Sequence, residues 1–184
     1  MREYMRMLKV WCFCALLILL VTWAASDAAD FAGGTGEPND PYQIATAEQL
    51  ILIGSDPNLL DKHFVLVNHI DLDPNLPGRH VFTRAVIAGQ VDATSQFLGA
   101  AFTGCFDGSS YRIRNLTINS NGANSLGLFG YIGRDGRVYD LDLENALIIG
   151  GSEIGGLAGY NLGSVTHCKA SVSVSGDWSV GGLV

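Results

Sequence analysis

The amino-acid sequence predicts an all-β protein, a parallel β-solenoid preceded by a short capping helix. Short apolar segments separated by Gly, Asn, Asp and Ser follow Lys62, and two motifs recur among them with nearly one period. One copy buries only three or four side chains, so copies must stack at the strand spacing of about 4.8 Å to build a core. A β-sandwich is the alternative, but short strands in a sandwich need no fixed period.

Residues 1–28 are predicted to be a secretory signal peptide. Arg2, Arg6 and Lys9 precede an apolar run at 10–21, and small residues follow it. Twelve apolar residues are short of the roughly 20 that span a bilayer. Cleavage is expected within Ser26–Ala29, and the alternative is an uncleaved membrane anchor.

Residues 29–62 are predicted to form a leader rich in turns and an N-terminal cap. Thr46 and Gln49 have the spacing of a capping box, in which each side chain bonds the backbone N–H of the other residue. A short helix is therefore expected from Ala47 to Ile53, ending at Gly54.

Residues 63–184 are predicted to be the solenoid. A six-residue pattern (apolar, any, polar, apolar, any, apolar or small) occurs four times, at 67–72, 113–118, 138–143 and 165–170. In this alignment Leu116, Leu141 and Cys168 stack in one column.

The polar third position of the pattern is expected at a bend of the chain. It is occupied by His69, Asn115, Asp140 and His167. Asn and Asp tolerate left-handed backbone and bond their neighbours in turns, which favours a bend at this position.

A second, glycine-containing motif alternates with the first, at 126–130, 154–159 and 180–184. The third copy stops at Val184, where the earlier ones continue. Because the open end of a solenoid exposes apolar side chains and unpaired strand edges, we expect the chain to continue beyond Val184. The 184-residue chain alone is expected to self-associate.

Residues 154–168 resemble the GLUG motif of bacterial surface and secreted proteins. Residues 102–118 resemble the coil that commonly precedes such repeats, and 42–72 resemble their usual N-terminal segment. The chain departs from the motif at His167, where Asn is usual, and this puts in doubt any site built on the polar positions. The resemblance implies a right-handed β-helix-like solenoid outside the cell and no particular activity.

The charge of the chain excludes one class of partner. The net charge is −7, and without residues 1–28 it is about −8, since 8 of 11 basic and 16 of 18 acidic residues remain. An acidic surface repels phosphate backbones, so nucleic acid is not an expected partner. The acidity is compatible with calcium binding or with solubility alone.

Two cysteines, Cys105 and Cys168, remain after the predicted cleavage. A pair in an exported protein suggests a disulfide, but it also fits two buried thiols. The repeat alignment places them at different positions of the coil, so we expect them not to be bonded to each other.

No catalytic, cofactor-binding or metal-binding residue is assigned from the sequence. An acidic residue and two arginines lie close together in the sequence: Asp107, Arg112 and Arg114. A β-helical polysaccharide lyase uses an acidic site and an arginine base, but a turn at Asp107 and two outward arginines explain this cluster more simply. The carboxylates that alternate with apolar residues are expected on a solvated face: Asp71, Asp73, Asp140, Asp142 and Glu144. The histidines have no ligand spacing.

The expected function is that of a non-catalytic exported scaffold, at the cell surface or secreted. Adhesion, or interaction with extracellular glycans or surface proteins, fits an exported repeat protein with no assigned cofactor. Two alternatives stay open, a β-helical carbohydrate-active enzyme and a passive stalk that presents a further domain. No stable membrane span is expected after signal cleavage.

Overall fold

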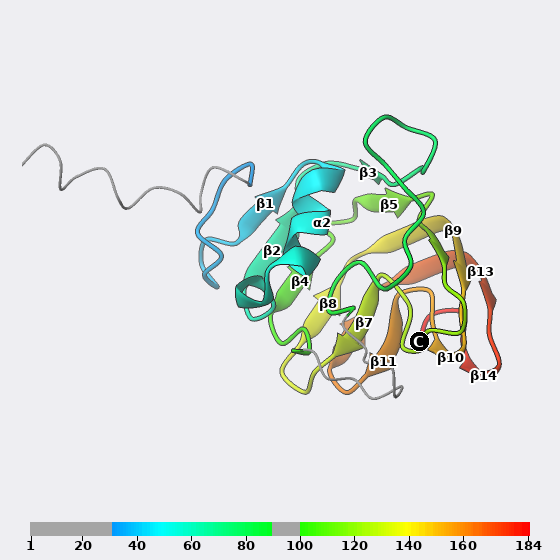
Figure 1. Ribbon diagram of the computed structural model, residues 1–184. Helices are drawn as coiled ribbons and strands as arrows, with labels where there is room; N and C mark the ends of the chain where they lie inside the picture. The colour runs from blue at the N-terminus through cyan, green and yellow to red at the C-terminus, as the bar shows by residue number, and fades with distance from the viewer. Residues whose placement is uncertain (1–30, 90–99) are drawn as a thin grey trace, which may run out of the picture. The chain divides into compact units, whose positions relative to one another are not determined.

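The computed structural model describes residues 31–89 and 100–184, so the predicted signal peptide lies outside the described residues. The described chain is mostly β-strand in parallel pairs, with one α-helix near its start (Figure 1). The predicted all-β class is therefore confirmed.

The helix α2 spans Ala47–Ser55 and begins at the predicted capping box. The Gln49 backbone N–H donates to the Thr46 hydroxyl at 3.4 Å, and the Thr46 N–H donates to the Gln49 side chain at 3.2 Å. Its apolar side is buried, with Leu50 and Ile53 fully covered. The helix was expected to run to Ile53 and to end at Gly54, but it continues through Gly54 to Ser55. The 3-10 helix η1 follows at Pro57–Leu59.

The first sheet has five parallel strands in the order β1-β2-β4-β8-β12. They are β1 Tyr42–Ile44, β2 His63–Leu66, β4 Cys105–Asp107, β8 Arg137–Tyr139 and β12 Ser164–Thr166. The outer edge of β1 is covered by the leader, because Ala32 N–H donates to Gln43 O and Gln43 N–H donates to Gly33 O.

The second sheet has the order β13-β9-β5-β3, with β6 also paired to β9. Its strands are β3 Ile70–Asp71, β5 Arg112–Arg114, β6 Thr117–Asn119, β9 Asp142–Ile149 and β13 Lys169–Ser175. Two further parallel pairs join β7 Phe129–Ile132 to β11 Ala158–Asn161, and β10 Ser152–Ile154 to β14 Trp178–Val180.

The chain passes through these sheets in the same order in each repeat, which is a β-helix-like path. One full coil contains β8, β9, β10 and β11, and the next contains β12, β13 and β14 (Figure 1). Single bridges from Phe82 to Ile118, Ile87 to Phe129 and Phe102 to Ile132 extend the path into an earlier coil. The sequence patterns missed that part of the earlier coil.

The pairings confirm the register of the glycine-containing motif. Leu126 lies opposite Ile154, which lies opposite Val180. Phe129 lies opposite Ala158.

The register of the six-residue pattern is right for its last two copies and wrong for its first two. Val138 lies opposite Val165, as predicted, but its neighbour on the other side is Phe106 and not Ile113. Ile113 lies opposite Leu143 instead.

Leu116 therefore does not share a column with Leu141 and Cys168. Thr117 lies opposite Leu147, which places Leu116 beside Ala146. The physical reason is that each coil bends at more than one corner, and the bend at Asn115 matches the bend at Asn145, not the one at Asp140.

Left-handed backbone occurs at three of the four predicted bends. The φ angles are 60° at Asn115 and 52° at both Asp140 and His167. His69 is the exception: its φ is not positive, and its backbone N–H donates to the side-chain oxygen of the neighbouring Asn68 at 2.8 Å. Bends of successive coils lie in rows, as in Ser125, Glu153 and Ser179.

The core runs through the stack as a continuous set of apolar side chains. Phe64, Phe102, Phe106 and Phe129 are fully covered, with ring centroids 5.1 Å apart between Phe102 and Phe129. Burial falls in the last described coil, where Val174 is only partly covered while Ile148 opposite it is fully covered.

Candidate functional site

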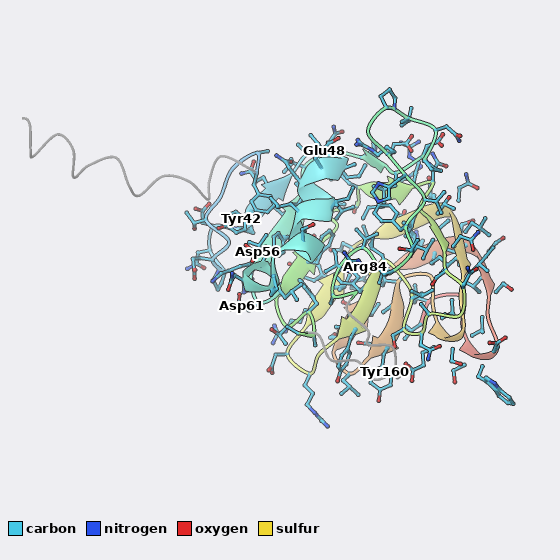
Figure 2. The ribbon with its side chains drawn as sticks, viewed as in Figure 1. Tyr42, Glu48, Asp56, Asp61, Arg84 and Tyr160 are labelled. Carbon is cyan, nitrogen blue, oxygen red and sulfur yellow. The ribbon has the colours of Figure 1, made fainter. Side chains whose placement is uncertain are left out.

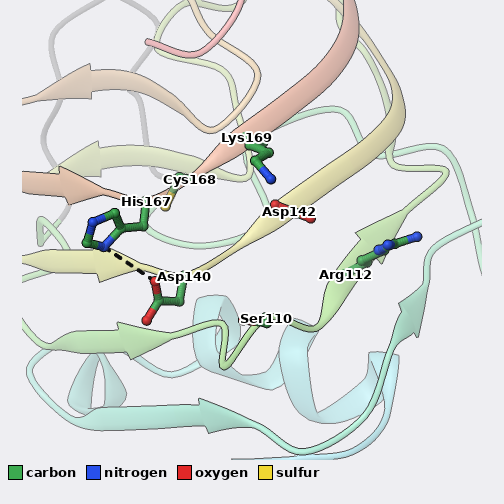
Figure 3. A pocket seen from close by; sticks show the side chains of 7 residues that line it. All are labelled: Ser110, Arg112, Asp140, Asp142, His167, Cys168 and Lys169. Carbon is green, nitrogen blue, oxygen red and sulfur yellow. Dashed lines mark ion pairs between the residues drawn. The ribbon is translucent and has the colours of Figure 1, made fainter.

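An open polar groove of about 710 Å³ lies where the first sheet bends into the second (Figure 3). It is lined by Ser110, Arg112, Asp140, Asp142, His167, Cys168 and Lys169. We name it the corner groove.

Stacking of three coils produces the corner groove. One row consists of the bend residues Ser110, Asp140 and His167, each with positive φ. The second row consists of Arg112, Asp142 and Lys169, which lie opposite one another at the start of β5, β9 and β13. The middle coil therefore contributes two carboxylates, with cationic side chains on both sides.

Some of these charges already have partners. The Nδ1 atom of His167 lies 3.5 Å from a carboxylate oxygen of Asp140, an ion pair when the imidazole is protonated (Figure 3). The Arg112 guanidinium lies 3.2 Å from Glu144, and the Arg112 backbone N–H donates to His69 Nδ1 at 3.1 Å.

Asp142 and Lys169 are the two remaining charged side chains of the corner groove. Lys169 extends toward Asp142 in Figure 3, but neither side chain makes an ion pair or hydrogen bond with any residue in 31–89 and 100–184. Both can therefore bind a ligand without breaking an ion pair or a hydrogen bond to another described residue.

Cys168 lines the corner groove with a half-buried thiol. Its Sγ donates to Thr166 O at 3.3 Å, and burial raises its pKa above the ordinary value for a thiol. A raised pKa leaves little thiolate at neutral pH, so the side chain is a weak nucleophile.

Cys105 and Cys168 are both free thiols, which confirms that they are not bonded to each other. They are half-buried, less covered than the sequence suggested. Burial raises the pKa of Cys105 as well, and desolvation together with the Cys105 contact raises the pKa of Tyr139 to about 12.

The structure does not join Asp107 to the two nearby arginines through any ion pair in its described part. Asp107 accepts a hydrogen bond from Ser109 N–H at 2.7 Å, which is the predicted turn. Arg112 is exposed on β5, whereas Arg114 is only partly exposed and its Nε is buried without a hydrogen-bond partner.

A polar ladder that the sequence interpretation missed crosses the outer face of the second sheet. Asn115 donates from its amide to Asp71 at 2.9 Å and accepts from the Asn145 amide at 2.6 Å. The available signal in the sequence was the spacing of thirty residues between Asn115 and Asn145. Both residues have positive φ in the structure. Among the described residues no group of three or more His, Cys, Asp and Glu side chains could hold a metal ion.

The exposed aromatic side chains lie elsewhere. Tyr160 on β11 points outward (Figure 2) and its ring centroid is 5.2 Å from that of Tyr131 on β7. Trp178, on β14, is 76% exposed.

Residues 150–175, from just before β10 to the end of β13, match the family described as "The GLUG motif". This segment contains residues 154–168, whose sequence resembles that motif. In the structure it forms the strands β10 to β13 of the stacked coils. The resemblance to the GLUG motif is therefore confirmed for this segment of the chain.

Two curated relatives are similar to the chain. Halomucin of Haloquadratum walsbyi is 32% identical over 169 residues, which cover 89% of this chain and 2% of halomucin. A "Putative Gly-rich membrane protein" of Evansella cellulosilytica is 33% identical over 156 residues, 80% of this chain and 16% of that protein. The chain thus spans a small part of either relative.

No solved structure matches the chain. None of the helices within the described residues is long and apolar enough to cross a membrane.

Proposed function

We propose that this chain is a non-catalytic, surface-associated repeat scaffold, secreted or held at the cell surface, that contacts extracellular glycans or surface proteins. We also propose that its coils are right-handed, as the GLUG resemblance implies. Export by residues 1–28 is part of the same proposal.

The observation that carries the proposal is the parallel stacking of polar outer rows. In the corner groove and in the Asp71–Asn115–Asn145 ladder, each coil presents a polar side chain at the same place. Such rows repeat at the strand spacing of about 4.8 Å, so an extended polymer can be contacted by several coils at once. The relative named as a membrane protein supports a location at the cell envelope.

The proposal is tested by expressing the whole chain in a host with a secretory pathway. Mass spectrometry of the product is expected to show a new N-terminus within Ser26–Ala29, and a membrane-impermeant label is expected to modify Lys169 on intact cells or in medium. An unprocessed protein that is protected from the label in intact cells would contradict it.

The competing proposal, a β-helical polysaccharide lyase, rests on the architecture and on Arg112 and Arg114. It predicts unsaturated products from acidic polysaccharides, with a rate that falls when either arginine is changed to Ala. The scaffold proposal predicts no turnover by the wild-type chain. A passive stalk would neither turn over polysaccharides nor bind extracellular glycans or surface proteins.

A further inference from the structure

We infer that the corner groove binds a chain of uncharged sugars that lies across the coils, and this rests on the proposed function. The inference narrows the expected ligands to polyhydroxylated, electrically neutral polymers. It also assigns the contacts to Arg112, Asp142 and Lys169.

The first step is the order of donors and acceptors in the row. Arg112 lies opposite Asp142, and Asp142 lies opposite Lys169, on three adjacent strands. Arg and Lys only donate hydrogen bonds, and an ionised Asp only accepts them. The row is therefore donor, acceptor, donor, with roughly 10 Å between its outer members.

The second step is the chemistry that satisfies such a row. A hydroxyl group donates one hydrogen bond and accepts two, so neighbouring sugar hydroxyls can donate to Asp142 while others accept from Arg112 and Lys169. All these bonds involve one charged partner, which makes them stronger than neutral ones.

The third step is the exclusion of charged polymers. A polyanion would approach the carboxylates of Asp140 and Asp142 on a chain whose net charge is −7. A polycation would meet Arg112 and Lys169 on both sides of those carboxylates. An uncharged ligand avoids both repulsions.

The fourth step is availability. Within the described residues the side chains of Asp142 and Lys169 make no ion pair or hydrogen bond, and Arg112 retains 48% side-chain exposure beside Glu144. The groove is open to solvent, so its contacts are partly screened and binding is expected to be weak for one short oligosaccharide and stronger for longer ones.

The test is titration of the full mature chain with defined oligosaccharides, followed by NMR chemical shifts or calorimetry. The probes are neutral glucose oligomers, oligouronates and glucosamine oligomers of equal length, each at low and high salt. We expect the neutral oligomers to bind with an affinity that salt barely changes, and to bind more tightly than either charged series.

Asp142→Ala is expected to lower the affinity for the neutral oligomers about tenfold, because one charge-assisted hydrogen bond is lost. Asp177→Ala is the matched control, since it removes an exposed carboxylate between β13 and β14. Unchanged thermal unfolding shows that both variants fold.

Three results would overturn the inference: tighter, salt-sensitive binding of either charged series, no binding of neutral oligomers, or equal losses in the two variants. Failure here leaves the scaffold proposal intact if the chain is processed and labelled at the surface. Failure of that labelling experiment overturns the scaffold proposal instead.

Discussion

At the scale of single residues, the corners of each coil depend on side chains that tolerate a left-handed backbone. Asn115 has two structural roles. Its backbone forms a corner with a φ of 60°, and its side-chain amide links Asp71 to Asn145 by hydrogen bonds. Asn and Asp favour this conformation, whereas β-branched residues are outliers in it.

Asn115→Val is therefore expected to lower the free energy of unfolding by about 1–3 kcal/mol, the usual range for a strained backbone. Asn119→Val is the control, because Asn119 is exposed at the end of β6 and its φ is not positive. Urea unfolding of the two variants measures the difference. Equal stability of the two proteins would show that the corner does not need a left-handed residue at 115.

A second residue-scale prediction concerns Glu48 at the start of α2 (Figure 2). The Arg79 guanidinium bonds this carboxylate and, with backbone and Thr46 bonds, lowers its pKa from 4.5 to about 2. A depressed folded pKa means that the stabilisation is present above about pH 4.5 and is lost as the pH falls toward 2.

Arg79→Met is expected to remove most of that pH dependence. Thermal unfolding of wild type and variant should differ above pH 4.5 and converge near pH 2. Because Glu48 is largely exposed, the difference is expected to be small. A gap between the two proteins that stays constant across this range would disprove the assigned pKa.

At the scale of elements, the sequence predicted most where a local signal was unique. The capping box of Thr46 and Gln49 located α2, and the glycine-containing motif aligned β7 with β11 and β10 with β14. The six-residue pattern failed at β5 because the corners at Asn115 and Asp140 have similar sequences. Apolar spacing alone cannot tell which corner of the coil a segment occupies.

The corner groove illustrates the same limit. Arg112, Asp140, Asp142 and His167 were each recognised as outward or bend residues, but their neighbours across coils depend on the register. Ser110 joins the row because its N–H donates to Asp140 O, a pairing that the predicted alignment excluded.

A further prediction for the elements follows from burial in β9 and β13. Ile148 is fully covered by coils on both sides, while Val174 opposite it is covered less. Ile148→Ala is expected to cost about 2–5 kcal/mol of unfolding free energy, and Val174→Ala roughly half of that or less. Denaturant titration checks the order, and a larger loss from Val174→Ala would mean that β13 is packed as tightly as β9.

At the scale of the whole molecule, stability and ligand contact both derive from one stacking register. Each coil contributes a few apolar side chains inward and a few polar ones outward, so neither core nor corner groove exists within a single coil. A shift of five residues between β6 and β9 would break both, which makes the register the central claim.

Engineered disulfides test that register most directly, in a background with Cys105→Ser and Cys168→Ser. Thr117 lies opposite Leu147 on paired strands, so the Thr117→Cys, Leu147→Cys protein is expected to oxidise readily, lose both free thiols as a monomer and gain thermal stability. The Thr117→Cys, Asp142→Cys protein carries the register that the six-residue pattern predicted. Its cysteines would lie roughly 16 Å apart along the strands, and both thiols should remain free. Oxidation of the second protein and not the first would contradict the account.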